Sequence, residues 1–151
     1  MIYYFCDGTP ESFFTAVFDA YNKECFITSD SEIQLSLGCE TVRVLADAEK
    51  CRRVLQGLKQ YDRNAEEDIL TALRNCSAQK EQVCFLYIKC IFERKTSIKN
   101  AYSLPAVVDF NDLLYKITGE THRLKGLLRF KETANGTFYA PYSPDNNITD
   151  L

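Results

Sequence analysis

The opening of the chain constrains the fold most, because its hydrophobic pattern changes there from a short apolar run to helical spacing. Residues 2–6 (IYYFC) form a continuous apolar run, which is typical of a buried strand. Asp7 and Gly8 then turn the chain, and Thr9 with the proline after it is a favourable start for a helix. Apolar residues recur at helical spacing through residues 10–22, which predicts an amphipathic helix.

The rest of the pattern predicts one more strand, further helices and a hairpin. Residues 41–45 contain β-branched side chains and predict a strand, whereas residues 25–40 are expected to be mostly loop, with a short strand near residues 33–37. Helices are expected to open near Asp47, Asn64, Ser77 and Pro105. Gly126 is expected to end the last helix or bend the chain, and the segments LLRFKET and TFYAPY predict a β-hairpin. We therefore expect an α+β fold with an N-terminal strand-helix-strand unit, a helical middle of about four helices and a C-terminal β-hairpin.

Composition narrows the class of protein further. A chain of 151 residues with 46% hydrophobic residues suits a single globular domain over residues 1–151. The net charge of −3 means that the whole chain is not a polycation, so any site for an anion must be local. No apolar run approaches the roughly 20 residues of a membrane span, and the N-terminus lacks the pattern of a signal peptide. These features predict a cytoplasmic protein with no membrane partner.

The cysteines favour buried free thiols over a metal site. There are seven, an odd number, and no two of them form a CxxC pair. Free cysteine behaves as a small buried hydrophobe, and thiols stay reduced in a cytosol. We expect no metal ligands and no cofactor.

The strongest local signal is a basic segment from Lys116 to Lys131. Its cations are Lys116, Arg123, Lys125, Arg129 and Lys131. Glu120 is its only acid, so the segment carries +4 and the rest of the chain −7. Such segregation favours an anionic partner, and arginine and lysine both bind phosphate. In the predicted strand Arg129 and Lys131 alternate and therefore share one face, while Leu128 and Phe130 share the other.

Aromatic residues accompany this segment. Phe138, Tyr139 and Tyr142 on the facing strand offer flat surfaces on which a base could stack. The alternative is that the basic face is merely solvated or pairs with acids elsewhere in the chain, and that Phe138 and Tyr139 belong to the core.

Two further groups of residues have both a functional and a structural interpretation. His122 is the only histidine, and with Glu120 it is a candidate acid/base, although a lone histidine near a helix end more often caps or packs than catalyses. Lys50 and Arg53 share a helix face and could extend a phosphate track, or they could be solvated surface. Asp47 is first of all a helix cap.

Four segments resemble a known family. They are YYFCDGTPESFFTAVFDAY, ADAEKCRRVLQGL, ETHRLKGLLRF and TFYAPYSPDNN. Together they resemble a bacterial family of probable DNA-metabolism proteins of unknown function. Its members are typically linked to a radical-SAM protein thought to act in DNA modification or repair, and some are fused to a uracil-DNA-glycosylase-like domain.

The resemblance implies a set of motif residues. The third segment, which resembles EAHR-x-KG-x-x-RF, gives Glu120, His122, Arg123, Lys125, Gly126, Arg129 and Phe130. The second, which resembles TD-x-x-KA-x-RV-x-x-G, gives Asp47, Lys50, Arg53 and Gly57. The sequence departs from that second pattern at Ala46 and Cys51. The family usually continues beyond the position of Leu151, so a site shared with that further part would be incomplete here.

Three hypotheses follow. The favoured one is a DNA-metabolism accessory module that works beside a radical-SAM or glycosylase partner. It would bind phosphates of single-stranded or damaged DNA through His122, Arg123, Lys125, Arg129 and Lys131. The second is an enzyme domain acting on a nucleobase or nucleotide, with His122 as acid/base and Arg123 or Arg129 as a clamp. The third is an adaptor whose basic face docks on an acidic surface of the radical-SAM partner.

Overall fold

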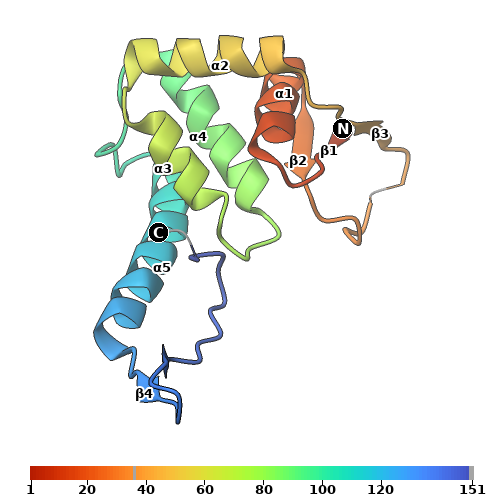
Figure 1. Ribbon diagram of the computed structural model, residues 1–151. Coiled ribbons are helices and arrows are strands. Elements are labelled where there is room, and N and C mark those ends of the chain that lie inside the picture. The colour runs from red at the N-terminus through yellow and green to blue at the C-terminus, as the bar shows by residue number, and fades with distance from the viewer. Residues whose placement is uncertain (36, 150–151) are drawn as a thin grey trace.

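The computed structural model describes residues 1–35 and 37–149. Its N-terminal part contains a three-stranded parallel sheet of β1 (Ile2–Phe5), β2 (Cys25–Thr28) and β3 (Glu40–Arg43), in the order β2-β1-β3 (Figure 1). The strands predicted at 2–6 and 41–45 are confirmed, with ends that differ by at most two residues.

The helices follow the predicted order and confirm the α+β class. They are α1 (Pro10–Ala20), α2 (Ala48–Tyr61), α3 (Ala65–Ala72), α4 (Lys80–Arg94) and α5 (Pro105–Leu127). None of the helices described combines the length and the apolar character needed to cross a bilayer.

Local capping explains where two of these helices begin. The Thr9 hydroxyl accepts a hydrogen bond from the Ser12 N–H (3.2 Å) at the start of α1. The Asp47 carboxylate accepts from the N–H groups of Glu49 (2.9 Å) and Lys50 (3.1 Å) at the start of α2. These side chains satisfy N–H groups that have no partner within the helix.

The starts expected near Asn64 and Pro105 are confirmed, whereas the one expected at Ser77 is wrong by three residues. Asn64 precedes α3 but makes no capping hydrogen bond through its side chain. α4 begins at Lys80 rather than at Ser77, whose hydroxyl accepts a hydrogen bond from the Gln79 N–H before the helix starts (3.3 Å).

The prediction for residues 25–40 is wrong in two respects. β2 lies inside the expected loop, and the described residues of 33–37 do not form a strand. Four residues are too short a run to show a clear period, and the strand exists because its backbone pairs with β1 in a parallel register. Ile27 is fully buried in a strand that packs against α4, so tertiary contacts decide this element.

The core lies between the sheet and the helices. α1 packs on α2, and α4 packs on α2, α5 and β2. At the contact of α4 with α5, the rings of Tyr87 and Phe110 stack with centroids 3.8 Å apart and planes 9° apart. This packing fixes the first half of α5 in the body of the protein.

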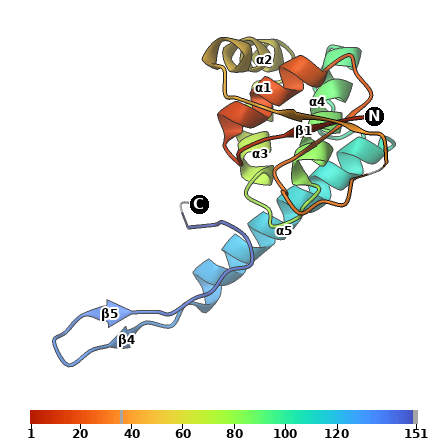
Figure 2. The same ribbon diagram turned by 90° about the vertical axis from the view of Figure 1, so that its right-hand side faces the viewer.

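The second half of α5 projects from that body and carries the hairpin at its end (Figure 2). The hairpin consists of β4 (Lys131–Glu132) and β5 (Phe138–Tyr139), and the chain then returns along α5. We call residues 116–142 the arm. The predicted hairpin is confirmed, but its strands are shorter than expected because α5 continues to Leu127, one residue beyond Gly126.

Candidate nucleic-acid interface

Glu120 fastens the returning chain to the arm. It lies on α5 and is only 5% exposed. Its Oε1 accepts a hydrogen bond from the N–H of Asp145 (2.7 Å), and its Oε2 accepts from the backbone N–H (3.1 Å) and the side-chain amide (2.6 Å) of Asn146. The amide of Asn146, followed by the N–H of Asp145, holds the pKa of Glu120 below its ordinary value, because these donors favour the ionised form.

Two buried asparagines extend this anchor to the turn between α3 and α4. The N–H of Cys76 donates to Oδ1 of Asn146 (2.8 Å). The side-chain amide of Asn75 donates to the carbonyl of Leu113 on α5 (3.2 Å), and its Oδ1 accepts from the N–H of Ser77 (2.9 Å). A buried polar network with its partners in place rigidifies the segments that it joins. Two segments that are distant in sequence, residues 75–77 and residues 145–146, are thereby held against the middle of α5.

The first of two hollows on the arm, which we call the outer hollow, has a volume of about 400 Å³. Arg123, Arg129 and Lys131 line it, together with leucines at the end of α5 and Tyr142 of the returning chain. None of these three cations lies within 4 Å of an acid in the described part of the chain. The structure therefore brings three unpaired positive charges from α5, the link after it and β4 to one concave surface.

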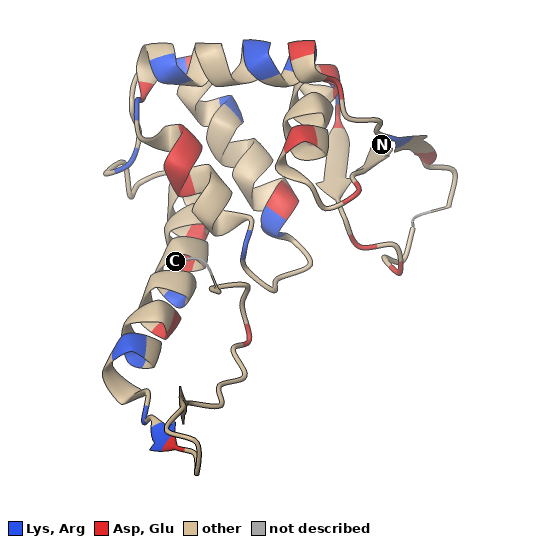
Figure 3. Cartoon of the chain, viewed as in Figure 1, with Lys and Arg blue, Asp and Glu red and all other residues tan. Residues whose placement is uncertain are grey.

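The route to this arrangement differs from the predicted one. Arg129 precedes β4 and is not part of a strand, so it does not alternate with Lys131 along one. The two side chains share the outer hollow because the chain bends between α5 and the hairpin. Figure 3 shows the lysine and arginine segments along the lower part of α5 and at β4.

The second hollow, which we call the inner hollow, lies further up α5 and has a volume of about 600 Å³. His122 lines it with Lys116 and Arg123, so Arg123 belongs to both hollows. His122 is exposed. Glu120 also lines this hollow, but both of its oxygens accept hydrogen bonds from the returning chain, which argues for an anchoring role over that of an acid/base.

The aromatic residues of the arm are on its surface. Phe138 is 62% exposed, Tyr139 is 48% exposed and Phe130 is 64% exposed, so these residues are not part of the core. Lys125 is also exposed and lines neither hollow. The arm thus offers apolar rings next to unpaired cations, a combination found in surfaces that bind single-stranded nucleic acid.

The residues of the second motif lie elsewhere. Lys50 pairs with Asp19 (2.7 Å), and the guanidinium of Arg53 lies over the ring of Phe18, 4.9 Å from its centroid. α2 is at the opposite end of the molecule from the hairpin (Figure 1), so these two cations do not extend the charge of the arm. Asp47 caps α2, as the sequence predicts.

Gly57 has a packing role on α2. A Cβ atom built at this position would lie 2.9 Å from the ring of Phe92. That ring is held edge-on between Tyr21 and Tyr61, with centroid distances of 5.8 and 6.2 Å. Glycine allows α2 to approach α4 closely.

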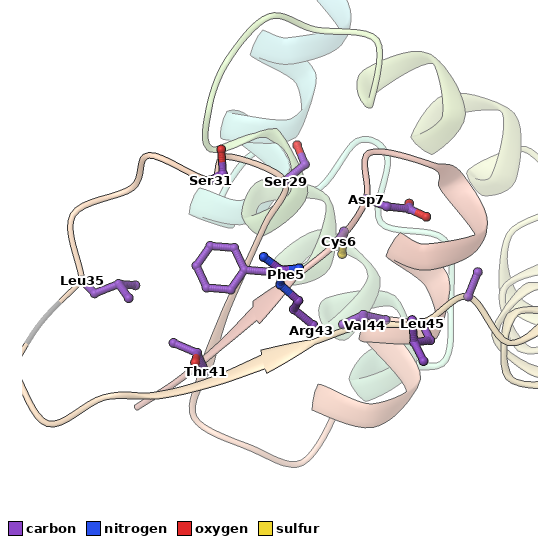
Figure 4. Close-up of a pocket in the computed structure, with 11 residues that line it drawn as sticks. Phe5, Cys6, Asp7, Ser29, Ser31, Leu35, Thr41, Arg43, Val44 and Leu45 are labelled. Atoms are coloured by element: carbon purple, nitrogen blue, oxygen red, sulfur yellow. The ribbon is translucent and has the colours of Figure 1, made fainter.

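A third hollow lies at the carboxyl ends of the three parallel strands, a common place for ligands in open sheets (Figure 4). Arg43 points from β3 toward Phe5 at the end of β1. Burial raises the pKa of the Cys6 thiol to about 12, so this sulfur is protonated near neutral pH and is a poor nucleophile. Asp7 Oδ1 already accepts hydrogen bonds from the N–H (2.8 Å) and the hydroxyl (2.6 Å) of Thr9, so this oxygen has its partners within the turn before α1.

Sequence reasoning missed the residues that hold the site together. No local pattern shows that Asn75 bonds Leu113 or that Asn146 bonds Glu120 and Cys76, because these partners lie 26 to 70 residues away in the sequence. Gly119, which lines the inner hollow, was also missed, although a glycine inside a helical pattern is a signal in itself. Within residues 1–35 and 37–149, no group of histidine, cysteine and acidic side chains is arranged to hold a metal ion.

Comparison with known proteins adds one match. Residues 78–151 match the model of a family described as a domain of unknown function, DUF4130. No curated protein and no solved structure matches the chain. The match covers just under half of the chain, including α4, α5 and the hairpin, and it leaves out the first two segments of the wider resemblance. The part of the chain that carries the basic arm is therefore similar to a domain whose function is not known.

Proposed function

We propose that the arm binds the phosphate backbone of nucleic acid, with single-stranded DNA as its preferred form. The observation that carries this proposal is the outer hollow, where Arg123, Arg129 and Lys131 converge without an acid within 4 Å of them. Unpaired cations on a concave surface bind phosphates, and arginine does so with two parallel hydrogen bonds.

The preference for single strands rests on the exposed rings. Tyr142 lines the outer hollow, and Phe138 and Tyr139 follow β4 on the facing strand. Unstacked bases gain free energy by stacking on such rings, whereas the bases of a duplex are already stacked. The phosphates would supply most of the affinity, and the rings would favour strands whose bases are free.

The biological setting is a further part of the proposal. The resemblance to probable DNA-metabolism proteins supports an accessory role in DNA modification or repair, beside a radical-SAM protein or a glycosylase-like domain. A cytoplasmic location agrees with seven thiols that are all free.

The test is fluorescence anisotropy with labelled single-stranded and double-stranded DNA, using the wild type and the double variant Arg123→Ala/Arg129→Ala. We expect salt-dependent binding that is tighter for the single strand, and that is weaker and less dependent on salt in the variant. Absence of binding at low salt would refute the proposal. In that case, nuclease-resistant capture of a protein by the arm would favour an adaptor instead.

The enzyme hypothesis is tested by a different variant, His122→Ala, and by a different measurement, turnover. His122→Ala would abolish turnover of a nucleotide while leaving DNA binding intact, if His122 acted as the acid/base. The hydrogen bonds to Glu120 leave His122 without a free carboxylate from that residue, so we expect binding without turnover.

A further inference from the structure

Hydrogen bonds hold the segments around the inner hollow in place, and the space above Gly119 within it is open. The walls of this hollow are α5, the turn at residues 75–77 and the segment at residues 145–146, which the hydrogen bonds of Glu120, Asn75 and Asn146 hold together. These buried groups have partners already, so they define the shape of the hollow without needing a ligand. A preformed hollow of this kind binds a ligand at a lower entropic cost.

Gly119 forms part of the floor of the inner hollow. It lies in the interior of α5, where glycine costs about 0.5–1 kcal/mol relative to alanine. A Cβ atom built at Gly119 meets nothing within 4 Å, so no neighbouring side chain requires glycine there. A methyl group at this position would instead occupy space inside the hollow. Glycine keeps that space open.

The groups left free around this floor are mainly cationic. Lys116 and Arg123 have no acid within 4 Å among the described residues, and His122 lies beside them. The charge of Glu120 is already engaged by N–H donors. Asp145 is the one further acid that lines the hollow, and its carboxylate can accept a hydrogen bond from a hydroxyl or an amine.

We propose that the inner hollow binds the terminal phosphate monoester of a DNA strand whose internal phosphates lie in the outer hollow. This inference rests on the proposed function. Arg123 connects the two hollows, so a strand along the arm leads from one into the other. A phosphate monoester carries nearly two negative charges and three acceptor oxygens, whereas an internal diester carries one charge. It therefore gains more from Lys116, His122 and Arg123. Asp145 accepts a hydrogen bond from the sugar or base of the same terminal nucleotide.

The experiment compares three single-stranded oligonucleotides of identical sequence, with a 5′-phosphate, a 3′-phosphate, or hydroxyl groups at both ends. Binding is measured by competition against a labelled strand with hydroxyl ends. We expect one of the two phosphorylated strands to bind wild-type protein about tenfold tighter than the hydroxyl strand, because a charge-assisted hydrogen bond supplies that order of affinity. The strand that gains identifies which end enters the hollow.

Gly119→Ala and Gly126→Ala form a matched pair of variants. Both glycines lie on α5 with open space at the built Cβ, but only Gly119 lines the inner hollow. Both variants should fold and melt at or above the wild-type temperature, because alanine favours a helix. Gly119→Ala should lose the preference for the phosphorylated strand, and Gly126→Ala should keep it. Lys116→Ala should also reduce the preference without filling the hollow.

Three results would overturn the inference, and they separate it from the proposed function. Equal affinity of wild-type protein for all three strands, with salt-dependent binding intact, would remove the terminal-phosphate site and leave backbone binding in place. Full retention of the preference in Gly119→Ala would show that the phosphate binds elsewhere. Absence of binding to every strand would refute the proposed function and this inference together.

Discussion

Removal of two cations from the outer hollow should change the salt dependence of DNA binding by a predictable amount. The perturbation is Arg123→Ala/Arg129→Ala, which leaves Lys131 as the one cation lining that hollow. Both arginines are exposed, and no ion pair within the described residues depends on them. The fold should therefore survive the change, and the effect on binding can be attributed to the lost charges.

The magnitude follows from the number of phosphates neutralised. For single strands the logarithm of the binding constant falls with the logarithm of salt concentration with a slope of about −0.7 per phosphate contact. Three cations in the outer hollow give a slope of about −2, so that affinity falls roughly 20-fold between about 50 mM and about 200 mM salt. With Lys131 alone the slope is about −0.7, and the fall over the same range is roughly threefold. Contacts from the inner hollow would steepen both slopes equally, apart from any contact of Arg123 there.

The assay is anisotropy titration of a labelled single strand at several salt concentrations. The control is Lys50→Ala/Arg53→Ala, which removes the same charge from α2, at the other end of the molecule. We expect the control to keep the wild-type slope. An unchanged slope in the Arg123/Arg129 variant, or an equal reduction in the control, would refute the assignment of the outer hollow as the phosphate site.

Three further predictions concern the structure that supports the site. Glu120→Gln should loosen the returning chain and speed amide hydrogen exchange at Asp145, whereas Glu132→Gln on the hairpin should not. Because the folded state lowers the pKa of Glu120, the ionised carboxylate stabilises the fold fully at neutral pH. In wild-type protein this stabilisation should fade as the pH falls below the ordinary range of a glutamate. Gly57→Ala should lower the free energy of unfolding by about 1–2 kcal/mol in chemical denaturation, because the clash with the Phe92 ring outweighs the gain in helix propensity. A melting temperature at or above that of the wild type would contradict this packing role. Tyr87→Phe should raise the free energy of unfolding by about 1 kcal/mol, because the buried Tyr87 hydroxyl has no hydrogen-bond partner among the described residues; a clear loss of stability would reveal a partner for that hydroxyl.

Local chemistry made much of the secondary structure predictable. Thr9 and Asp47 cap helices because a side-chain oxygen can reach an N–H two or three residues ahead, and that spacing is visible in the sequence. Helical apolar spacing located α1 and α2 for a similar reason, since residues three or four apart share a face. β2 was not predictable in this way, because its backbone partners are on β1 and its burial depends on α4.

For the candidate site as well, some features were predictable from the sequence and others depended on the fold. The sequence by itself determined that positive charge is concentrated between Lys116 and Lys131, because the count of charges needs no coordinates. Tertiary structure decided which of those charges act together. Arg129 joins Arg123 through the bend after α5, whereas Lys50 is paired with Asp19 on the far side of the protein.

The role of Glu120 depended entirely on the tertiary structure. In the sequence it is an acid beside a histidine, which is equally typical of a catalytic pair and of a helix surface. In the structure its partners are N–H groups 25 and 26 residues further along the chain. Hydrogen bonds over such separations form only when the fold brings the segments together, so no periodicity or local motif records them. The sequence therefore determined the charge of the arm and the helix that carries it, and the fold determined the shape of the surface that this charge lines.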